Sequence, residues 1–182
     1  MLRRGTDLVD LTRRYDRAVA GVVASVPQVL LFTAVGRAGG KGRLADWLAD
    51  RFARFNDHVR EVADRSGATL VDMGAAAVLT DRRVWDLDRL HLNADGHTRV
   101  AAAVLEQLGV DRPDLLGGPV GWWREPLPAA VPVPRRVSAA ADLVWARTHL
   151  LPWLGRRLTG RSSGDRRSAK DPVLRVVLPP VA

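Results

Sequence analysis

Asp88 and His91 are the residues best suited by type and spacing to do chemistry, three positions apart in Asp-Leu-Asp-Arg-Leu-His-Leu-Asn. A carboxylate beside an imidazole holds one ring tautomer and stabilises the charged ring, so the other ring nitrogen can take a proton from a hydroxyl. The same residues also fit a simple turn, in which Asp88 and Asn93 cap the backbone and His91 is a polar loop residue. On spacing alone, the simple turn is the favoured interpretation.

The hydrophobic pattern around this pair predicts a parallel α/β arrangement. Apolar residues recur at helical spacing over 8–25, 44–66 and 98–108, which predicts three helices with one apolar side each. Nearly continuous apolar runs predict buried strands over 28–33 and 68–71. Strand, long helix, strand, polar loop and helix, in this order, are typical of a parallel sheet covered by helices.

Capping residues predict where these helices begin and end. Thr6 or Asp7 can cap the first helix, and Asn93 or Asp95 can begin the last one. Gly67 is placed to end the long helix, because glycine readily adopts the left-handed conformation found after helix ends. The polar loop that carries the Asp–His pair is therefore expected directly before a helix N-terminus.

The segment 35–42 contains four glycines and follows the first predicted strand. Its spacing matches neither the phosphate-binding P-loop nor the dinucleotide fingerprint, so we expect a flexible loop that borders the ligand crevice. Asp72 stands at the end of the second predicted strand. We expect this carboxylate to cap the loop that follows rather than to act in chemistry.

The composition excludes several classes of site. The 182 residues contain no cysteine, which rules out disulfides and thiol chemistry. The four histidines are too scattered for a zinc site, so we expect neither metal nor cofactor. The formal net charge of +8 comes almost wholly from arginine, because Lys41 and Lys170 are the only lysines. Such a basic surface can attract nucleic acid or anionic lipid.

The stretch 18–36 carries no charge and is long enough to be compared with a membrane span. Pro27 and Gln28 interrupt it, and its halves differ in pattern, so helix, turn and strand are the favoured interpretation. The first residues do not have the pattern of a signal peptide, and we therefore expect a cytoplasmic protein.

The composition changes after residue 110. Prolines predict an extended linker over 111–137, an amphipathic Trp/Arg helix follows over 138–160 with Ser138 as its cap, and Pro152 should kink it. The basic tail 161–182 is expected to be disordered. The residues after 110 carry +6 of the net charge. Contact with nucleic acid, contact with an anionic membrane, and a helix that packs back onto the domain all remain open, with the last favoured.

The string Asp88-Arg-Leu-His91-Leu-Asn93-Ala-Asp-Gly-His97, followed by an Ala/Val-rich helix, resembles the last conserved block of the SGNH hydrolases, the GDSL-type esterases and lipases. The resemblance implies that His91 is the general base and that Asp88 orients it. It also implies a flavodoxin-like three-layer α/β fold and a serine that attacks a small-molecule ester. Residues 1–110 would then be the C-terminal part of such a domain.

The chain departs from that family in lacking the strings that carry the nucleophile and the oxyanion hole. It has no Gly-Asp-Ser and no Gly-x-Asn-Asp, and its opening resembles family sequence that follows the oxyanion-hole asparagine. Two parallel strands also make a poor core alone. We therefore expect a fragment, inactive alone, with the missing strings encoded upstream. The alternative is a non-catalytic, basic interaction protein that binds nucleic acid or an anionic membrane surface.

Overall fold

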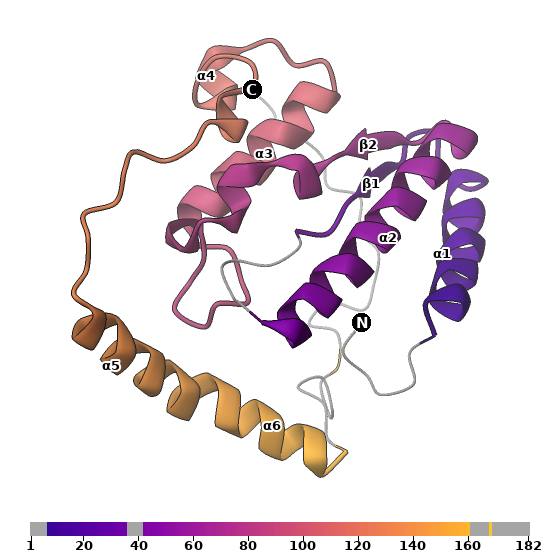
Figure 1. Ribbon diagram of the computed structural model, residues 1–182. Coiled ribbons are helices and arrows are strands. Elements are labelled where there is room, and N and C mark those ends of the chain that lie inside the picture. Colours follow the sequence, from indigo (N-terminus) through magenta and orange to yellow (C-terminus); the bar gives the residue numbers. More distant parts are fainter. Residues whose placement is uncertain (1–6, 36–41, 161–167, 169–182) are drawn as a thin grey trace. The chain divides into compact units, whose positions relative to one another are not determined.

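The computed structural model describes residues 7–35, 42–160 and 168. The chain divides into two compact units, Met1–Val131 and Pro132–Ala182 (Figure 1). The predicted glycine-rich loop lies mostly outside the described residues, and so does the predicted basic tail.

A two-stranded parallel sheet lies within the first unit. Strand β1 (Leu30–Phe32) pairs with strand β2 (Thr69–Val71), with Leu31 opposite Leu70. Helix α2 (Arg43–Ser66) connects the two strands (Figure 1). The predicted strand–helix–strand order is confirmed, although both strands are shorter than the apolar runs that predicted them.

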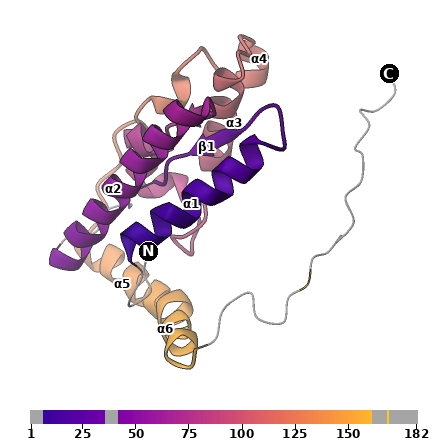
Figure 2. The same ribbon diagram turned by 90° about the vertical axis from the view of Figure 1, so that its right-hand side faces the viewer.

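Helices α1 (Leu8–Val23) and α2 lie side by side and pack on one face of the sheet (Figure 2). Their shared core contains Val19 from α1 and Val59 and Val62 from α2, together with Leu31 from the sheet. Each helix supplies these residues from its apolar side, as the helical spacing predicts. The uncharged stretch thus forms the end of α1, a turn and β1. None of the described helices is long and apolar enough to cross a membrane.

Local signals set the ends of these helices. The side chain of Asp7 accepts a hydrogen bond of 2.9 Å from the backbone N–H of Val9 and so caps α1. Gly67 ends α2 in the left-handed conformation, at φ 70°. Both agree with the capping pattern in the sequence.

A histidine joins the two helices of this layer. His58 on α2 lies 2.7 Å from Asp16 on α1, and Arg65 donates to the same carboxylate. Tyr15 meets both Phe55 and His58 edge to face. His58 thus ties α1 to α2.

The opposite face of the sheet is covered by short turns and by helix α3 (Ala94–Gln107). Three 3-10 turns, η1 (Met73–Ala75), η2 (Ala77–Thr80) and η3 (Arg82–Val84), lead from β2 towards it. Helices on one face and α3 on the other, around a small parallel sheet, give the α/β arrangement that was predicted. The buried residues of this second core are Val71, Met73, Ala76, Val78, Leu79, Val84, Ala102, Ala103 and Trp123.

The prediction of an extended linker over 111–137 is wrong for its first part. This part contains helix α4 (Pro113–Leu116) and the 3-10 turn η4 (Trp122–Arg124), and only 2% of Trp123 is exposed. Because Trp123 fills the core beside α3, the first unit extends to Val131 rather than to residue 110.

The second unit contains one helical rod in three parts. Helix α5 (Arg135–Trp145) leads through a π-helical turn (Ala146–Leu150) into helix α6 (Leu151–Leu158). The rod begins directly after Pro134, three residues before the predicted cap at Ser138. The wider turn lies directly before Pro152, whose ring would clash with the carbonyl four residues earlier in a regular α-helix.

Candidate functional site

The segment 86–91 forms a loop on a short antiparallel stem between η3 and α3. Trp85 and Leu92 form an antiparallel bridge. The amide of Asp86 donates to the carbonyl of His91 at 2.9 Å, and the amide of Asn93 donates to the carbonyl of Val84 at 3.1 Å. The loop is therefore closed at its base by backbone hydrogen bonds that do not involve its acidic and basic side chains.

Asp88 and His91 meet inside this loop. The Nδ1–H of His91 donates to Oδ2 of Asp88 at 2.6 Å. The other oxygen, Oδ1, accepts the backbone N–H groups of Leu90 at 2.9 Å and His91 at 3.0 Å. Arg89 adopts the left-handed conformation, with φ 61°, which an arginine rarely does without a tertiary reason. The turn capped by Asp88 and the hydrogen bond between Asp88 and His91, which the spacing left as alternatives, are thus both present.

These contacts keep Asp88 ionised. The backbone N–H of His91 and then its side chain lower the pKa of Asp88 from the ordinary 3.8 to about 2, with a further contribution from the Leu90 amide. A hydrogen bond to the charged form of a carboxyl group favours that form, which is the cause of the shift. At neutral pH the carboxylate accepts, so the proton of a neutral His91 ring is fixed on Nδ1.

The imidazole of His91 is open to solvent. Its side chain is 72% exposed, whereas that of Asp88 is 29% exposed. Since Asp88 engages Nδ1, the lone pair of the neutral ring is on Nε2. A partner hydroxyl that reached Nε2 could give up its proton there, and Asp88 would stabilise the resulting cation.

Asn93 joins the two ends of the loop. Its Oδ1 accepts the N–H of Gly96 at 3.0 Å and so caps α3, and its Nδ2 donates to the carbonyl of Arg83 at 2.7 Å. Gly96 lies so close to the stem that a Cβ there would stand 2.4 Å from the carbonyl oxygen of Val84. The predicted cap at Asn93 is confirmed, and the same amide also fixes where the loop begins.

A second polar cluster lies where the strands end. Asp72 accepts the hydroxyl of Thr33 at 2.7 Å and the Nε–H of Arg60 at 2.9 Å. Burial alone would raise the pKa of Asp72, but the hydrogen bonds from Arg60 and Thr33 lower it overall, with a smaller contribution from the Ala75 amide. Asn56 forms two hydrogen bonds of 2.8 Å with the backbone of Ala34. This cluster joins both strands to α2, and its polar groups are engaged with one another.

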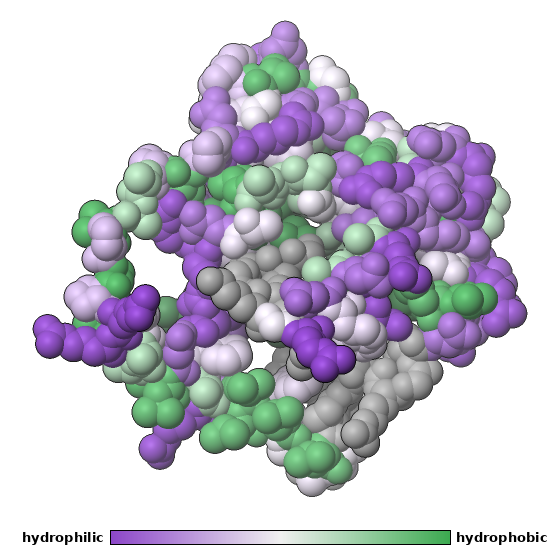
Figure 3. Space-filling view, in the orientation of Figure 1, coloured by the Kyte–Doolittle hydropathy of each residue, from purple (hydrophilic) through white to green (hydrophobic). Residues whose placement is uncertain are grey.

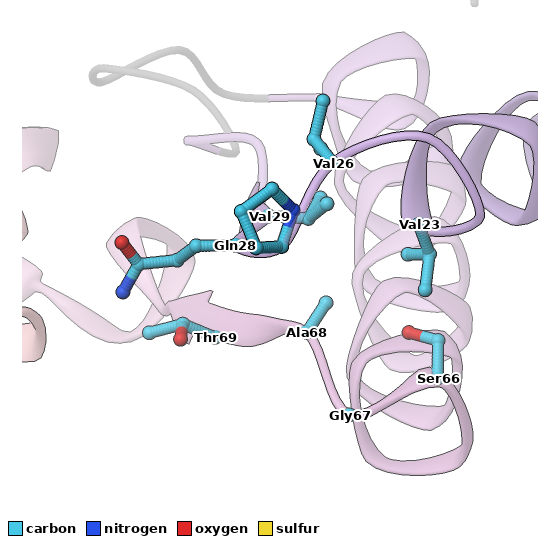
Figure 4. A pocket seen from close by; sticks show the side chains of 9 residues that line it. Val23, Val26, Gln28, Val29, Ser66, Gly67, Ala68 and Thr69 are labelled. Atoms are coloured by element: carbon cyan, nitrogen blue, oxygen red, sulfur yellow. The ribbon is translucent and has the colours of Figure 1, made fainter.

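A hollow of about 450 Å³ lies at the other end of the sheet, where the strands begin (Figure 4). Its lining comprises Val23 and the segments 26–29 and 66–69, which include no acid, base or histidine. Neither Asp88 nor His91 lines it. It therefore offers no group for acid–base chemistry.

Three of the described serines are engaged elsewhere in hydrogen bonds to nearby backbone. Ser25, Ser66 and Ser138 each donate to a carbonyl three or four residues earlier in the chain. In the part of the chain that the structure describes, no cluster of three or more His, Cys, Asp or Glu side chains could hold a metal ion.

Sequence reasoning missed two charged residues on α3 that bind a later part of the chain. Arg99 and Glu106 on α3 bind the turn around Trp123, which the sequence placed in a linker. The available signal was the pair Trp122–Trp123 in a proline-rich stretch, because large aromatic side chains seldom stay in water.

Comparison with known proteins gave one match. The sequence model of the GDSL-like Lipase/Acylhydrolase family matches residues 2–99, just over half of the chain, and the matched span includes Asp88 and His91. No curated protein and no solved structure matched the chain.

Proposed function

Since this chain belongs to the GDSL-like lipase/acylhydrolase family, we propose that Asp88 and His91 form the acid–base half of a serine esterase site acting on small-molecule esters. The observation that carries the proposal is the 2.6 Å hydrogen bond between the His91 Nδ1–H and Asp88 Oδ2, beside a largely exposed imidazole. The family match supports the reaction class, and the geometry supports the two roles.

In the proposed reaction, a serine hydroxyl attacks the ester carbonyl and its proton passes to Nε2 of His91. The imidazolium then gives this proton to the departing alkoxide, which leaves as an alcohol, and an acyl-serine remains. Water, deprotonated by His91, then attacks the acyl-serine; the bond to the serine oxygen breaks, His91 returns the proton to that oxygen, and the acid is released. The 182 residues contain no Gly-Asp-Ser string. The proposal therefore assigns roles to His91 and Asp88 and assigns no residue of this chain as the nucleophile or as an oxyanion donor.

We expect the 182-residue chain to hydrolyse p-nitrophenyl acetate slowly, because an imidazole without a serine and oxyanion donors gives only weak catalysis. His91→Ala should reduce release of p-nitrophenolate to the buffer rate. His97→Ala, which removes another histidine from the same stretch, is the matched control and should leave the rate unchanged. A serine-directed phosphonate should not label the protein.

Equal rates for the wild type and His91→Ala would contradict the proposed role of the base. Fast turnover that both His91→Ala and the phosphonate abolish would show that a serine of this chain is the nucleophile. That result would correct the expectation that the chain alone is nearly inactive.

The helical rod of the second unit favours a further contact, with an anionic membrane surface. None of the described residues of α5 or of the π-helical turn is buried. Figure 3 shows hydrophobic side chains gathered along this rod. Over 135–158 the sequence has five arginines and one aspartate, a formal charge of +4. The exposed apolar side chains of the rod are Val137, Leu143, Val144, Leu151, Leu154 and Leu158.

Apolar and cationic side chains on one helix match the two parts of an anionic bilayer surface. The aliphatic groups can enter the acyl boundary while the arginines meet the headgroups. A nucleic acid would engage the arginines but would leave the leucines in water. We therefore propose an anionic bilayer, rather than nucleic acid, as the surface that this rod contacts.

Binding of the full chain to phosphatidylserine-rich vesicles tests the proposal, with pure phosphatidylcholine vesicles and a single-stranded oligonucleotide as the other probes. Arg135→Glu with Arg136→Glu should weaken vesicle binding by at least about tenfold, because each basic residue near such a surface contributes about 1 kcal/mol. The matched control changes Arg13 and Arg14 on α1, which are also exposed. Leu151→Asp with Leu158→Asp should abolish vesicle binding.

Oligonucleotide binding that survives the two leucine changes, without vesicle binding by the wild type, would overturn the membrane proposal in favour of nucleic acid. Absence of binding to every probe would overturn it as well.

A further inference from the structure

A segment outside the family match binds to η3 and α3, the two elements that flank the loop carrying Asp88 and His91. We propose that residues 118–128, which we call the brace, position the Asp88–His91 loop by holding both ends of its stem. The inference rests on the proposed function for its catalytic meaning, but the structural claim can be tested without any activity. The family match ends at residue 99, so the brace lies outside the matched residues.

Glu106 on α3 receives three hydrogen bonds from the brace. Its Oε2 accepts the N–H of Gly121 at 2.8 Å and the indole N–H of Trp123 at 2.9 Å, and its Oε1 accepts from Arg124 at 3.0 Å. Burial would raise the pKa of Glu106, yet these donors lower it overall. A carboxylate held by three donors, one of them charged, is a strong and directional attachment.

Arg99 provides the second attachment on α3. Only 7% of this residue is exposed, and its Nη1 donates to the carbonyls of Trp122, Trp123 and Glu125 at 3.3, 3.0 and 3.0 Å. Its guanidinium also lies 5.0 Å from the centre of the Trp122 ring. Since a buried charge must be compensated, these carbonyls fix the turn of the brace relative to α3.

The brace is also attached to η3, on the N-terminal side of the loop, through Arg83. The Nη1 of Arg83 donates to the carbonyl of Pro128 at 2.7 Å, while Asp81 holds the rest of the guanidinium. The backbone carbonyl of Arg83 accepts from Asn93, the residue that caps α3. One segment thus contacts the chain on both sides of the loop.

Packing connects the same parts. Trp123 belongs to one buried cluster with Val84, which begins the stem, and Ala103 on α3. Leu92, directly after His91, packs against this cluster. Movement of the Trp123 side chain would therefore open space beneath the residues on either side of the loop. Because the brace bonds both to Arg83 of η3 and to Arg99 and Glu106 of α3, it fixes the spacing of these two elements from outside the loop.

Amide hydrogen exchange of the full-length protein, followed by NMR, tests the brace. The reporters are the amides of Asp86 and Asn93, which close the loop, and the reference is the amide of Thr69, which bonds to the carbonyl of Val29 in the sheet. We expect Glu106→Gln to speed exchange of the two reporters by about tenfold relative to Thr69, as loss of one charged hydrogen bond implies.

Asp50→Asn is the matched control, since it removes an exposed carboxylate on α2 that pairs with Arg54. It should leave all three rates unchanged. Trp123→Phe keeps the ring in the core but loses the indole N–H, and it serves if Glu106→Gln does not fold. The Asp88 carboxyl signal gives a second readout, because its pKa should rise from about 2 towards 3.8 when the loop loosens.

Equal acceleration of Thr69 and the reporters would mean that Glu106 supports the fold as a whole, and would overturn the positioning role. Unchanged reporter rates in both variants would overturn it too. Faster loop exchange together with ester hydrolysis that does not depend on His91 would support the brace while the proposed function fails, so the two failures are distinguishable.

Discussion

Asp88 is the residue on which the loop depends, because its two oxygens accept three hydrogen bonds within four residues of chain. One bond orients the imidazole of His91, and the other two hold the backbone that carries it. A single carboxylate therefore sets both the tautomer of the ring and the shape of the turn. Replacing it changes geometry as well as charge.

The lowered pKa of Asp88 predicts how stability varies with pH. Its pKa falls on folding from 3.8 to about 2, so the stabilisation is fully present above the unfolded value and is lost as pH falls through the folded one. The difference in urea midpoint between the wild type and Asp88→Asn should be constant near neutral pH and shrink between about pH 4 and pH 2.

Asp50→Asn, which changes an exposed carboxylate on α2, provides the baseline for that experiment. A gap between the wild type and Asp88→Asn that persists undiminished at pH 2, or that is absent near neutral pH, would show that the pair does not form in solution.

The sequence predicted the Asp88–His91 pair and the Asn93 cap, but not the residues on α3 that hold the brace. Asp-x-x-His and the following Asn are local patterns, so spacing suffices to place them in one turn. Glu106 and Arg99 act on residues 15 to 26 positions away in the chain. Helical periodicity gives no sign of such partners, since a charged residue on α3 is expected to face solvent.

At the level of elements, α3 and the loop stem approach closely at Gly96. The N–H of Gly96 is capped by Asn93, and the carbonyl of Val84 lies where a side chain would begin. The helix can therefore start directly after the loop only if this position has no Cβ. The sequence pattern that predicted the helix did not predict this contact, because it depends on how the helix meets η3.

Gly96→Ala should destabilise the protein by about 1–3 kcal/mol, because the new methyl group would have to displace the stem. Gly21→Ala on α1 is the matched control: a Cβ there meets nothing within 4 Å, and alanine should stabilise the helix by about 0.5–1 kcal/mol. Chemical denaturation of both variants measures the difference.

Opposite signs for the two substitutions are the expected result. A neutral or stabilising effect of Gly96→Ala would mean that the stem moves aside freely, and would argue against a tightly held loop.

For the whole molecule, the extent of the first unit follows from where its core is completed. Apolar runs in the sequence predicted β1, β2 and the helices that cover them, because these patterns are local and periodic. The segment after α3 reads as linker from its prolines, yet Trp123 completes the core beside Val71 and Leu79. Burial of one aromatic residue is a tertiary event that composition does not show.

The brace is attached to α3 by an anionic side chain, Glu106, and by a cationic one, Arg99, and these respond differently to acid. Protonation of Glu106 would weaken its bonds to Gly121, Trp123 and Arg124, whereas a guanidinium stays charged over the whole range in which proteins fold. Arg99 would therefore keep its hydrogen bonds to the carbonyls of Trp123 and Glu125 after those of Glu106 had weakened. Acid would therefore loosen the attachment at Glu106 while those at Arg99 and Arg83 stay in place.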